Sequence, residues 1–181
     1  MKRTPIPSWA WYTGLPIHCL LLWWLQRDRL DLLRLILREM VLIFGYIAAI
    51  GDGRRTIVPN RLILCMLGVW WMMIVPQLIL QTERTIAVMI SGILGLLLSG
   101  ILLLLVYLLS RKGLGGGDVK FMAVSGLYLG MDLVLSTMLI GSLLAAITGI
   151  LLIALKKIQK SDAIPLIPFL YVGMVVTTYF S

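Results

Sequence analysis

Residues 86–118 read IAVMISGILGLLLSGILLLLVYLLSRKGLGGGD, an apolar run followed by two bases, a glycine-rich stretch and an aspartate. The apolar part, 86–109, is long enough to cross a bilayer, which takes about 20 residues. Glycine weakens a helix by about 1 kcal/mol relative to alanine, and an ionised aspartate near hydrocarbon costs roughly 2.5 kcal/mol or more. Because Gly115–Gly117 and Asp118 combine both penalties at the edge of a span, we expect Asp118 to have a chemical function.

The composition extends this membrane interpretation to the whole chain. Of the 181 residues, 60% are hydrophobic, and the mean hydropathy is +1.01. Soluble domains are about 45–50% apolar. The apolar segments are long and lack the alternation of β-strands, which argues against a membrane β-barrel. We therefore predict an all-α, polytopic transmembrane helix bundle without a separate soluble domain.

The apolar runs predict six core spans within residues 35–181. Short polar turns are expected at 81–84 and 131–132, and the spans are 35–50, 62–80, 86–109, 119–130, 133–155 and 164–180. Residues 1–34 form an N-terminal extension, in which the apolar run 14–25 is an extra short span or an interfacial helix. A cleaved signal peptide is the least favoured alternative for this run.

The net charge of +8 has a topological explanation. The bases fall in short loops between spans, as the positive-inside rule describes, so no nucleic-acid partner is predicted. If each span, including 14–25, crosses once and the loops carrying Asp52 and Asp118 face the cytoplasm, 11 of the 16 Lys and Arg residues lie on that side. This orientation places Asp52 and Asp118 together at the cytoplasmic face.

Only eight acidic residues are present, which limits the choice of catalytic groups. Six of them are interpreted as ion-pair partners, turn residues or a helix cap: Asp28 and Asp31 among arginines, Glu39 in a helix-surface pair with Arg34 or Arg38, Glu83 and Asp132 in turns on the opposite face, and Asp162 as a cap. Asp52 and Asp118 remain as candidates. The alternative is that Asp52 pairs with a neighbouring arginine and that Asp118 is a simple N-cap.

Two aspartates are sufficient for peptide hydrolysis. Carboxyl groups a few ångströms apart share one proton, so the ionised group activates water while the protonated group donates to the scissile carbonyl. The glycines at 115–117 allow an extended substrate to approach closely. No metal or cofactor is predicted, because neither the two cysteines nor the single histidine has the spacing of a ligand set. The pattern favours an intramembrane aspartyl protease.

At these positions the sequence resembles the GxGD intramembrane aspartyl proteases, and specifically their prepilin peptidase (type IV prepilin leader peptidase) branch. Gly115-Gly-Gly-Asp118 matches the Gly-x-Gly-Asp motif, and Lys120 follows the aspartate by two residues, as in that branch. Residues 52–60, DGRRTIVPN, resemble its first motif, and residues 164–169, IPLIPF, resemble its late proline-rich segment. The resemblance covers residues 35–181.

The resemblance implies an aspartic endopeptidase of the prokaryotic plasma (inner) membrane. Such an enzyme removes a short basic leader that ends in glycine from type IV pilin-like precursors at the cytoplasmic face, and a pilus or secretion apparatus is a further implied partner. Asp52 and Asp118 carry over as the catalytic pair, and the positions expected to contact substrate are Pro59, Asn60, Gly115, Gly117 and Lys120. The chain lacks the four-cysteine insertion that accompanies N-methylation in many members, so peptidase activity alone is expected.

Two other functions are alternatives. A small-solute transporter would carry ionisable residues near the bilayer midplane, whereas the acidic residues here lie at the ends of spans. A non-catalytic membrane subunit of a pilus, competence or secretion apparatus would not need both Asp52 and Asp118. The presence of both aspartates favours the protease.

Overall fold

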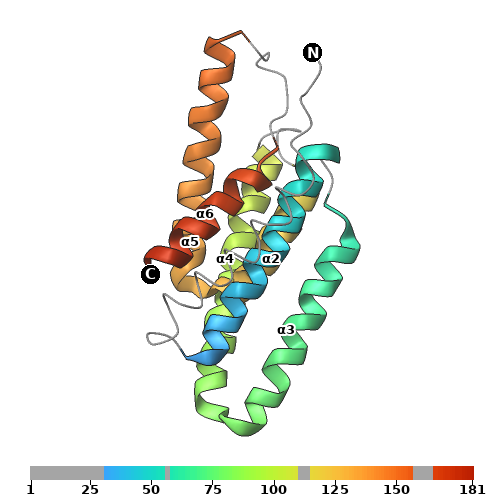
Figure 1. Ribbon diagram of the computed structural model, residues 1–181, viewed down its shortest axis with the longest axis vertical. Coiled ribbons are helices and arrows are strands. Elements are labelled where there is room, and N and C mark those ends of the chain that lie inside the picture. The colour runs from blue at the N-terminus through green and yellow to red at the C-terminus, as the bar shows by residue number, and fades with distance from the viewer. Residues whose placement is uncertain (1–30, 56–57, 110–114, 157–164) are drawn as a thin grey trace, which may run out of the picture.

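The computed structural model describes residues 31–55, 58–109, 115–156 and 165–181, with the backbone alone at 52–55 (Figure 1). These ranges contain no strand, which confirms the prediction of an all-α fold. The helices are α2 (Leu32–Arg55), α3 (Asn60–Leu80), α4 (Thr82–Leu109), α5 (Gly116–Ala154) and α6 (Ile167–Phe180). The predicted short span at 14–25 and the possible cap Asp162 lie outside the described residues.

Three of these helices, α3, α4 and α5, are long and apolar enough to cross a membrane. Many of their apolar side chains point outward, including Ile79 and Leu109, each 80% exposed. Apolar surface on this scale is unfavourable in water and is expected in lipid. The chain is therefore a membrane protein. The count of six core spans is not confirmed, because the described residues form five helices.

Helix α5 covers two of the predicted spans. We expected a span at 119–130, a turn at 131–132 and a second span at 133–155. The structure has two helical segments within α5 (Gly116–Ala154), which are separated at Gly130, next to the expected turn, where φ is 71° and ψ is 176°. Glycine adopts a positive φ without the steric cost that other residues bear. The N–H of Met131 donates to Ser91 Oγ at 3.2 Å, which satisfies an amide next to the break. Figure 1 shows the second segment running back toward the end of the bundle from which the first segment comes.

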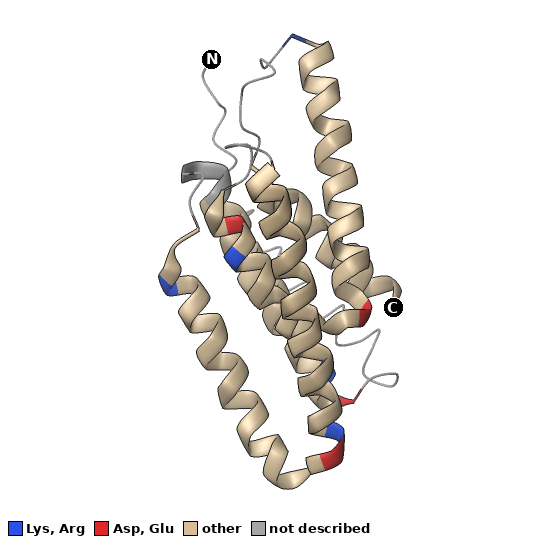
Figure 2. Cartoon of the chain, turned by 180° about the vertical axis from the view of Figure 1, so that it is seen from behind, with Lys and Arg blue, Asp and Glu red and all other residues tan. Residues whose placement is uncertain are grey.

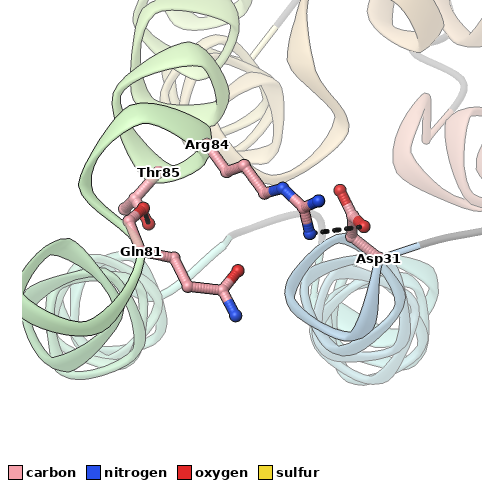
Figure 3. Close-up of polar contacts among 4 residues, drawn as sticks. All are labelled: Asp31, Gln81, Arg84 and Thr85. Atoms are coloured by element: carbon pink, nitrogen blue, oxygen red, sulfur yellow. Dashed lines mark hydrogen bonds and ion pairs between the residues drawn. The ribbon is translucent and has the colours of Figure 1, made fainter.

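Two predicted boundaries are wrong for local reasons. The expected turn 81–84 is largely helical, since α4 begins at Thr82 after a break at Gln81. Thr85 Oγ1 donates to the carbonyl of Gln81 at 2.8 Å (Figure 3). It also donates to the carbonyl of Gln77 at 3.0 Å, so it provides a hydrogen-bond donor for carbonyl groups at the end of α3. The last helix begins at Ile167 rather than at residue 164. Pro168 lies in its first turn, where backbone N–H groups have no partner within the helix, so proline costs no hydrogen bond there.

Small residues bring α4 and the first segment of α5 into close antiparallel contact. A Cβ atom added to Gly95 would lie 2.5 Å from the carbonyl oxygen of Gly126, and one added to Gly126 would meet the main chain of Gly95. Four residues later in α4, Ser99 Oγ donates to the carbonyl of Met122 at 3.1 Å. Close main-chain approach at small residues is a common way for helices to associate in membranes. This contact therefore sets the position of the first α5 segment.

The remaining helices are attached by a few specific contacts. The hydroxyl groups of Thr137 and Thr177 lie 2.8 Å apart and join the second segment of α5 to α6. Helix α3 lies at the side of the bundle (Figure 1). Trp70 Nε1 donates to the carbonyl of Leu127 at 3.2 Å, and the Tyr128 hydroxyl donates to the carbonyl of Met66. Both bonds connect α3 with the first segment of α5.

Gly126→Ala should lower the midpoint of thermal unfolding in detergent by several degrees. The added methyl group would meet the main chain of Gly95 and Leu96, which cannot rotate away, and overpacking of this kind costs about 1–3 kcal/mol. Gly68→Ala is the matched control, because a Cβ atom at Gly68 has no heavy atom within 4 Å. Equal midpoints for the two variants would contradict the proposed packing of α4 against α5.

Candidate active site

A groove lies at the end of the bundle where α2 ends and where α3 and α5 begin. Its volume is about 350 Å³, and its walls are two short segments, 58–60 and 115–118, together with Lys120. The five positions expected from the sequence to contact substrate all line this groove: Pro59, Asn60, Gly115, Gly117 and Lys120. The structure thus brings together two motifs that are 55 residues or more apart in the chain.

Asp118 is the acidic residue of the groove. It lies in the first turn of α5, and 9% of its surface is exposed. Its N–H donates to the carbonyl of Gly115 at 3.1 Å. The N-cap of α5 is Gly115, so the alternative that Asp118 is a simple N-cap is wrong. A carboxylate in the first turn of a helix is favoured by the amide dipoles there, and this one also faces a cavity.

The glycines of the motif have different surroundings. A Cβ atom on Gly117 would lie 3.2 Å from Val58 Cβ and 3.3 Å from the Val58 nitrogen, closer than ordinary van der Waals contact. A Cβ atom on Gly116 would have no heavy atom within 4 Å. Gly117 therefore sets how closely the two walls approach. The sequence analysis did not single out Val58, and the only available signal was its place as the apolar residue before Pro59.

The wall opposite Asp118 is formed where the chain enters α3. Pro59 is extended, with φ −69° and ψ 133°, and precedes the helix as its N-cap. Its carbonyl accepts a hydrogen bond from the N–H of Leu62 at 2.9 Å. Asn60 then begins α3, and its Oδ1 lies 3.5 Å from Lys120 Nζ, at the outer limit of hydrogen bonding. Asn60 and Lys120 are both exposed, so their polar groups are accessible from the groove.

Asp52 lies in the last turn of α2 and not in a loop, contrary to the sequence interpretation. Val58 follows Arg55, the last residue of α2, by three positions. Three residues span at most about 11 Å, so the last turn of α2 lies at the same end of the bundle as the groove. The structure describes the backbone of Asp52, and its pairing with Asp118 stays a prediction.

Other acidic residues have partners or surroundings that the sequence did not reveal. Asp31 was expected to pair among nearby arginines, but its Oδ1 lies 3.7 Å from Nη1 of Arg84 in α4 (Figure 3). Both carboxylate oxygens of Glu39 are buried, so Glu39 does not lie on the helix surface as expected, and its pairing with Arg34 or Arg38 stays a prediction. Glu83 lies in the first turn of α4 and is exposed. Figure 2 shows acidic and basic residues at both ends of the bundle.

Potential metal ligands are scattered in the ranges that the structure describes. No three side chains of His, Cys, Asp or Glu gather there as a metal site would require. Cys65, on α3, is exposed. The chemically distinctive feature of the groove is therefore its buried carboxylate among glycines, with an amide and an ammonium group on the rim.

Comparison with known proteins gives two matches. The model of a family described as the type IV leader peptidase family matches residues 39–150, which include both groove walls and Asp52. The prepilin leader peptidase/N-methyltransferase of Bacillus subtilis (strain 168) is 25% identical over 132 residues, covering 71% of this chain and 49% of the relative. The chain thus spans about half the length of this curated relative. No solved structure matches.

Proposed function

This chain belongs to the type IV leader peptidase family, and we propose that it is an intramembrane aspartic endopeptidase with Asp52 and Asp118 as its catalytic pair. Its substrates would be type IV pilin-like precursors, from which it removes a short basic leader at the cytoplasmic face. The observation that carries this assignment is the position of Asp118, a buried carboxylate in a groove formed by the two family motifs.

In the proposed reaction, the two carboxyl groups hold one proton between them. The ionised carboxylate removes a proton from water, and the water oxygen forms a bond to the scissile carbonyl carbon. The protonated carboxyl donates its proton to the carbonyl oxygen. The carbonyl then re-forms as one hydroxyl of the tetrahedral intermediate returns its proton to the dyad, the C–N bond breaks, and the amine leaves with the proton that the dyad took from water. Water is the nucleophile, so no covalent intermediate with the enzyme forms.

The groove suits an extended main chain better than a helix. Its glycine wall, Gly115–Gly117, has no side chains, which permits close approach of substrate backbone. Asn60 offers an amide donor and acceptor and Lys120 an ammonium donor, both suited to peptide carbonyl groups. A glycine before the scissile bond would fit the same constraint. The basic leader would remain at the cytoplasmic surface, where anionic lipids attract it.

We also propose that α5 crosses the membrane twice, which gives six core passes. Its 39 residues would form a helix about 58 Å long, whereas a hydrocarbon core is about 30 Å thick. The break at Gly130 supports a reversal within the membrane protein and not one long tilted helix. With six passes, the excess of Lys and Arg favours a cytoplasmic position for the groove.

The proposed activity does not include N-methylation. The region that matches the family contains one cysteine, Cys65, and therefore no CxxC pair. Incubation of the purified protein with a pilin-like precursor and a labelled methyl donor tests both parts of the proposal. We expect a shortened product that begins after the leader glycine and carries no label. Label in the mature product would refute the peptidase-only assignment, and an intact precursor would refute the protease.

Asp52→Asn and Asp118→Asn should each reduce cleavage of this precursor by at least about 100-fold, because each removes one of the two proton-transfer groups. Initial rates with purified variants of unchanged thermal midpoint provide the measurement. Glu83→Gln is the control, since Glu83 is exposed in the first turn of α4 and the same charge type is removed. Near-normal turnover by either aspartate variant would exclude that residue from the dyad.

Gly117→Ala should lower kcat/KM roughly tenfold. A displacement of 1 Å in an active site can cost about 100-fold, and the displacement expected here is smaller. The added Cβ atom must push Val58 away by a few tenths of an ångström, which displaces Asp118 relative to the opposite wall. Gly116→Ala should retain more activity, because its Cβ atom meets no neighbour within 4 Å. If both variants lose activity equally, contact with Val58 is not the reason for glycine at position 117.

A further inference from the structure

A second polar pocket lies where α2, α4 and the break in α5 meet, away from the Asp118 groove. Its volume is about 40 Å³. Its lining includes Arg34 and Arg38 from α2, Ser91 from α4, Tyr128 from the first segment of α5, and Asp132 just after the break at Gly130. Nothing in the proposed peptidase reaction uses these residues, so the pocket needs a separate explanation.

The position of the pocket along α2 relates it to the membrane. Asp52 follows Arg34 by 18 residues and Arg38 by 14, which corresponds to about 27 Å and 21 Å along a helix. A hydrocarbon core is about 30 Å thick. With the Asp52 end of α2 at one membrane surface, Arg34 lies near the opposite surface, and Arg38 lies one turn deeper, from where its long side chain extends toward the headgroups. Arg38 is half-buried and Arg34 is exposed, so the pocket opens outward from the bundle.

The charges that face the pocket favour an anion. Two guanidinium groups line it, against one carboxylate, that of Asp132. Arg34 and Arg38 are one helical turn apart, and like charges at this spacing repel each other. Glu39 is adjacent to Arg38 in sequence but does not line the pocket. Arg84, at the same end of the bundle, already forms its ion pair with Asp31 (Figure 3).

The donor groups and the size of the pocket define the anion further. Arginine forms paired hydrogen bonds with phosphate oxygens. Ser91 Oγ accepts a bond from the N–H of Met131, which leaves the serine hydroxyl proton for a ligand. Arg38 Nη1 donates to Ser181 Oγ at 2.8 Å, which restrains that side chain at the pocket. A water molecule needs about 10–15 Å³ of such volume, so the cavity has room for about three water-sized atoms, enough for the phosphorus and the two unesterified oxygens of a phosphodiester.

We propose that this pocket binds the phosphate of a phospholipid headgroup in the leaflet opposite the Asp118 groove. The chemistry shared with free phosphate is an oxyanion between two guanidinium groups and a serine hydroxyl. The depth of the arginines along α2 favours the lipid as its source. This inference does not depend on the peptidase assignment, because it uses none of the residues of the groove.

Binding of phosphatidylglycerol to the purified chain in neutral detergent tests the proposal, with diacylglycerol as the lipid that lacks phosphate and inorganic phosphate as the free ion. We expect saturable binding of phosphatidylglycerol and none of diacylglycerol. Arg34→Gln and Arg38→Gln should each raise Kd about tenfold. Arg84→Gln, which removes the same charge from the same end of the bundle, should change Kd less than twofold. Asp132→Asn should lower Kd, because it removes the carboxylate that opposes the anion.

Equal Kd values for the Arg34→Gln, Arg38→Gln and Arg84→Gln variants would refute this pocket as the binding site. The lipid would then bind only through a general attraction to positive charge. Saturable, Arg34-dependent binding of inorganic phosphate at millimolar concentration, without binding of phosphatidylglycerol, would overturn the lipid as the occupant. Arg34 is exposed, so its variant should fold even if Arg38→Gln does not. An unchanged thermal midpoint of Arg34→Gln without lipid is the check on folding, and unchanged precursor cleavage keeps the test separate from the proposed function.

Discussion

The close contact of α4 with the first segment of α5 is the constraint on which the other features depend. In a membrane, apolar side chains gain little by leaving lipid for protein, so helices associate through close packing and polar contacts. Here Gly95 and Gly126 allow two main chains to meet, and Ser99 bonds to the carbonyl of Met122 beside them. The first α5 segment is thereby held along α4. The same segment carries Asp118 at one end and Gly130 at the other, so its placement fixes both the groove and the second pocket.

Glycine performs three distinct tasks in this chain. At Gly126 it allows main chains of two helices to touch, at Gly130 it reverses the chain with a positive φ, and at Gly117 it brings the two walls of the groove together. Only the last task acts directly on the proposed chemistry. A glycine-rich composition alone would not distinguish these tasks, because each depends on which atoms lie opposite the missing Cβ.

The sequence predicted what apolar length and local motifs can determine. An all-helical membrane fold followed from the long apolar runs, and the groove walls followed from the segments around Pro59-Asn60 and Asp118. The break at Gly130 was predicted one residue later, as a short turn at 131–132. Asp132 follows Gly130 and was the local signal for a turn, whereas Gly100 lies within a long apolar run and remains helical. The burial of Glu39 and the pairing of Asp31 with Arg84 depend on tertiary neighbours, which an amphipathic pattern in one helix does not specify.

The reversal at Gly130 also bears on the shape of the bilayer. Between Asp118 and Gly130 lie 12 residue steps, or about 18 Å of helix, well below the thickness of an undisturbed hydrocarbon core of about 30 Å. In the proposed six-pass arrangement this segment is a short pass, which a membrane accommodates by thinning of the surrounding lipid. The annulus around this part of the molecule would then be compressed, and water and headgroups would lie closer to the midplane than elsewhere. In the proposed reaction, a helical substrate would diffuse through this compressed annulus before it reached the catalytic groups. Part of its apolar surface would leave the hydrocarbon there, so hydrophobic mismatch would contribute to unwinding the helix.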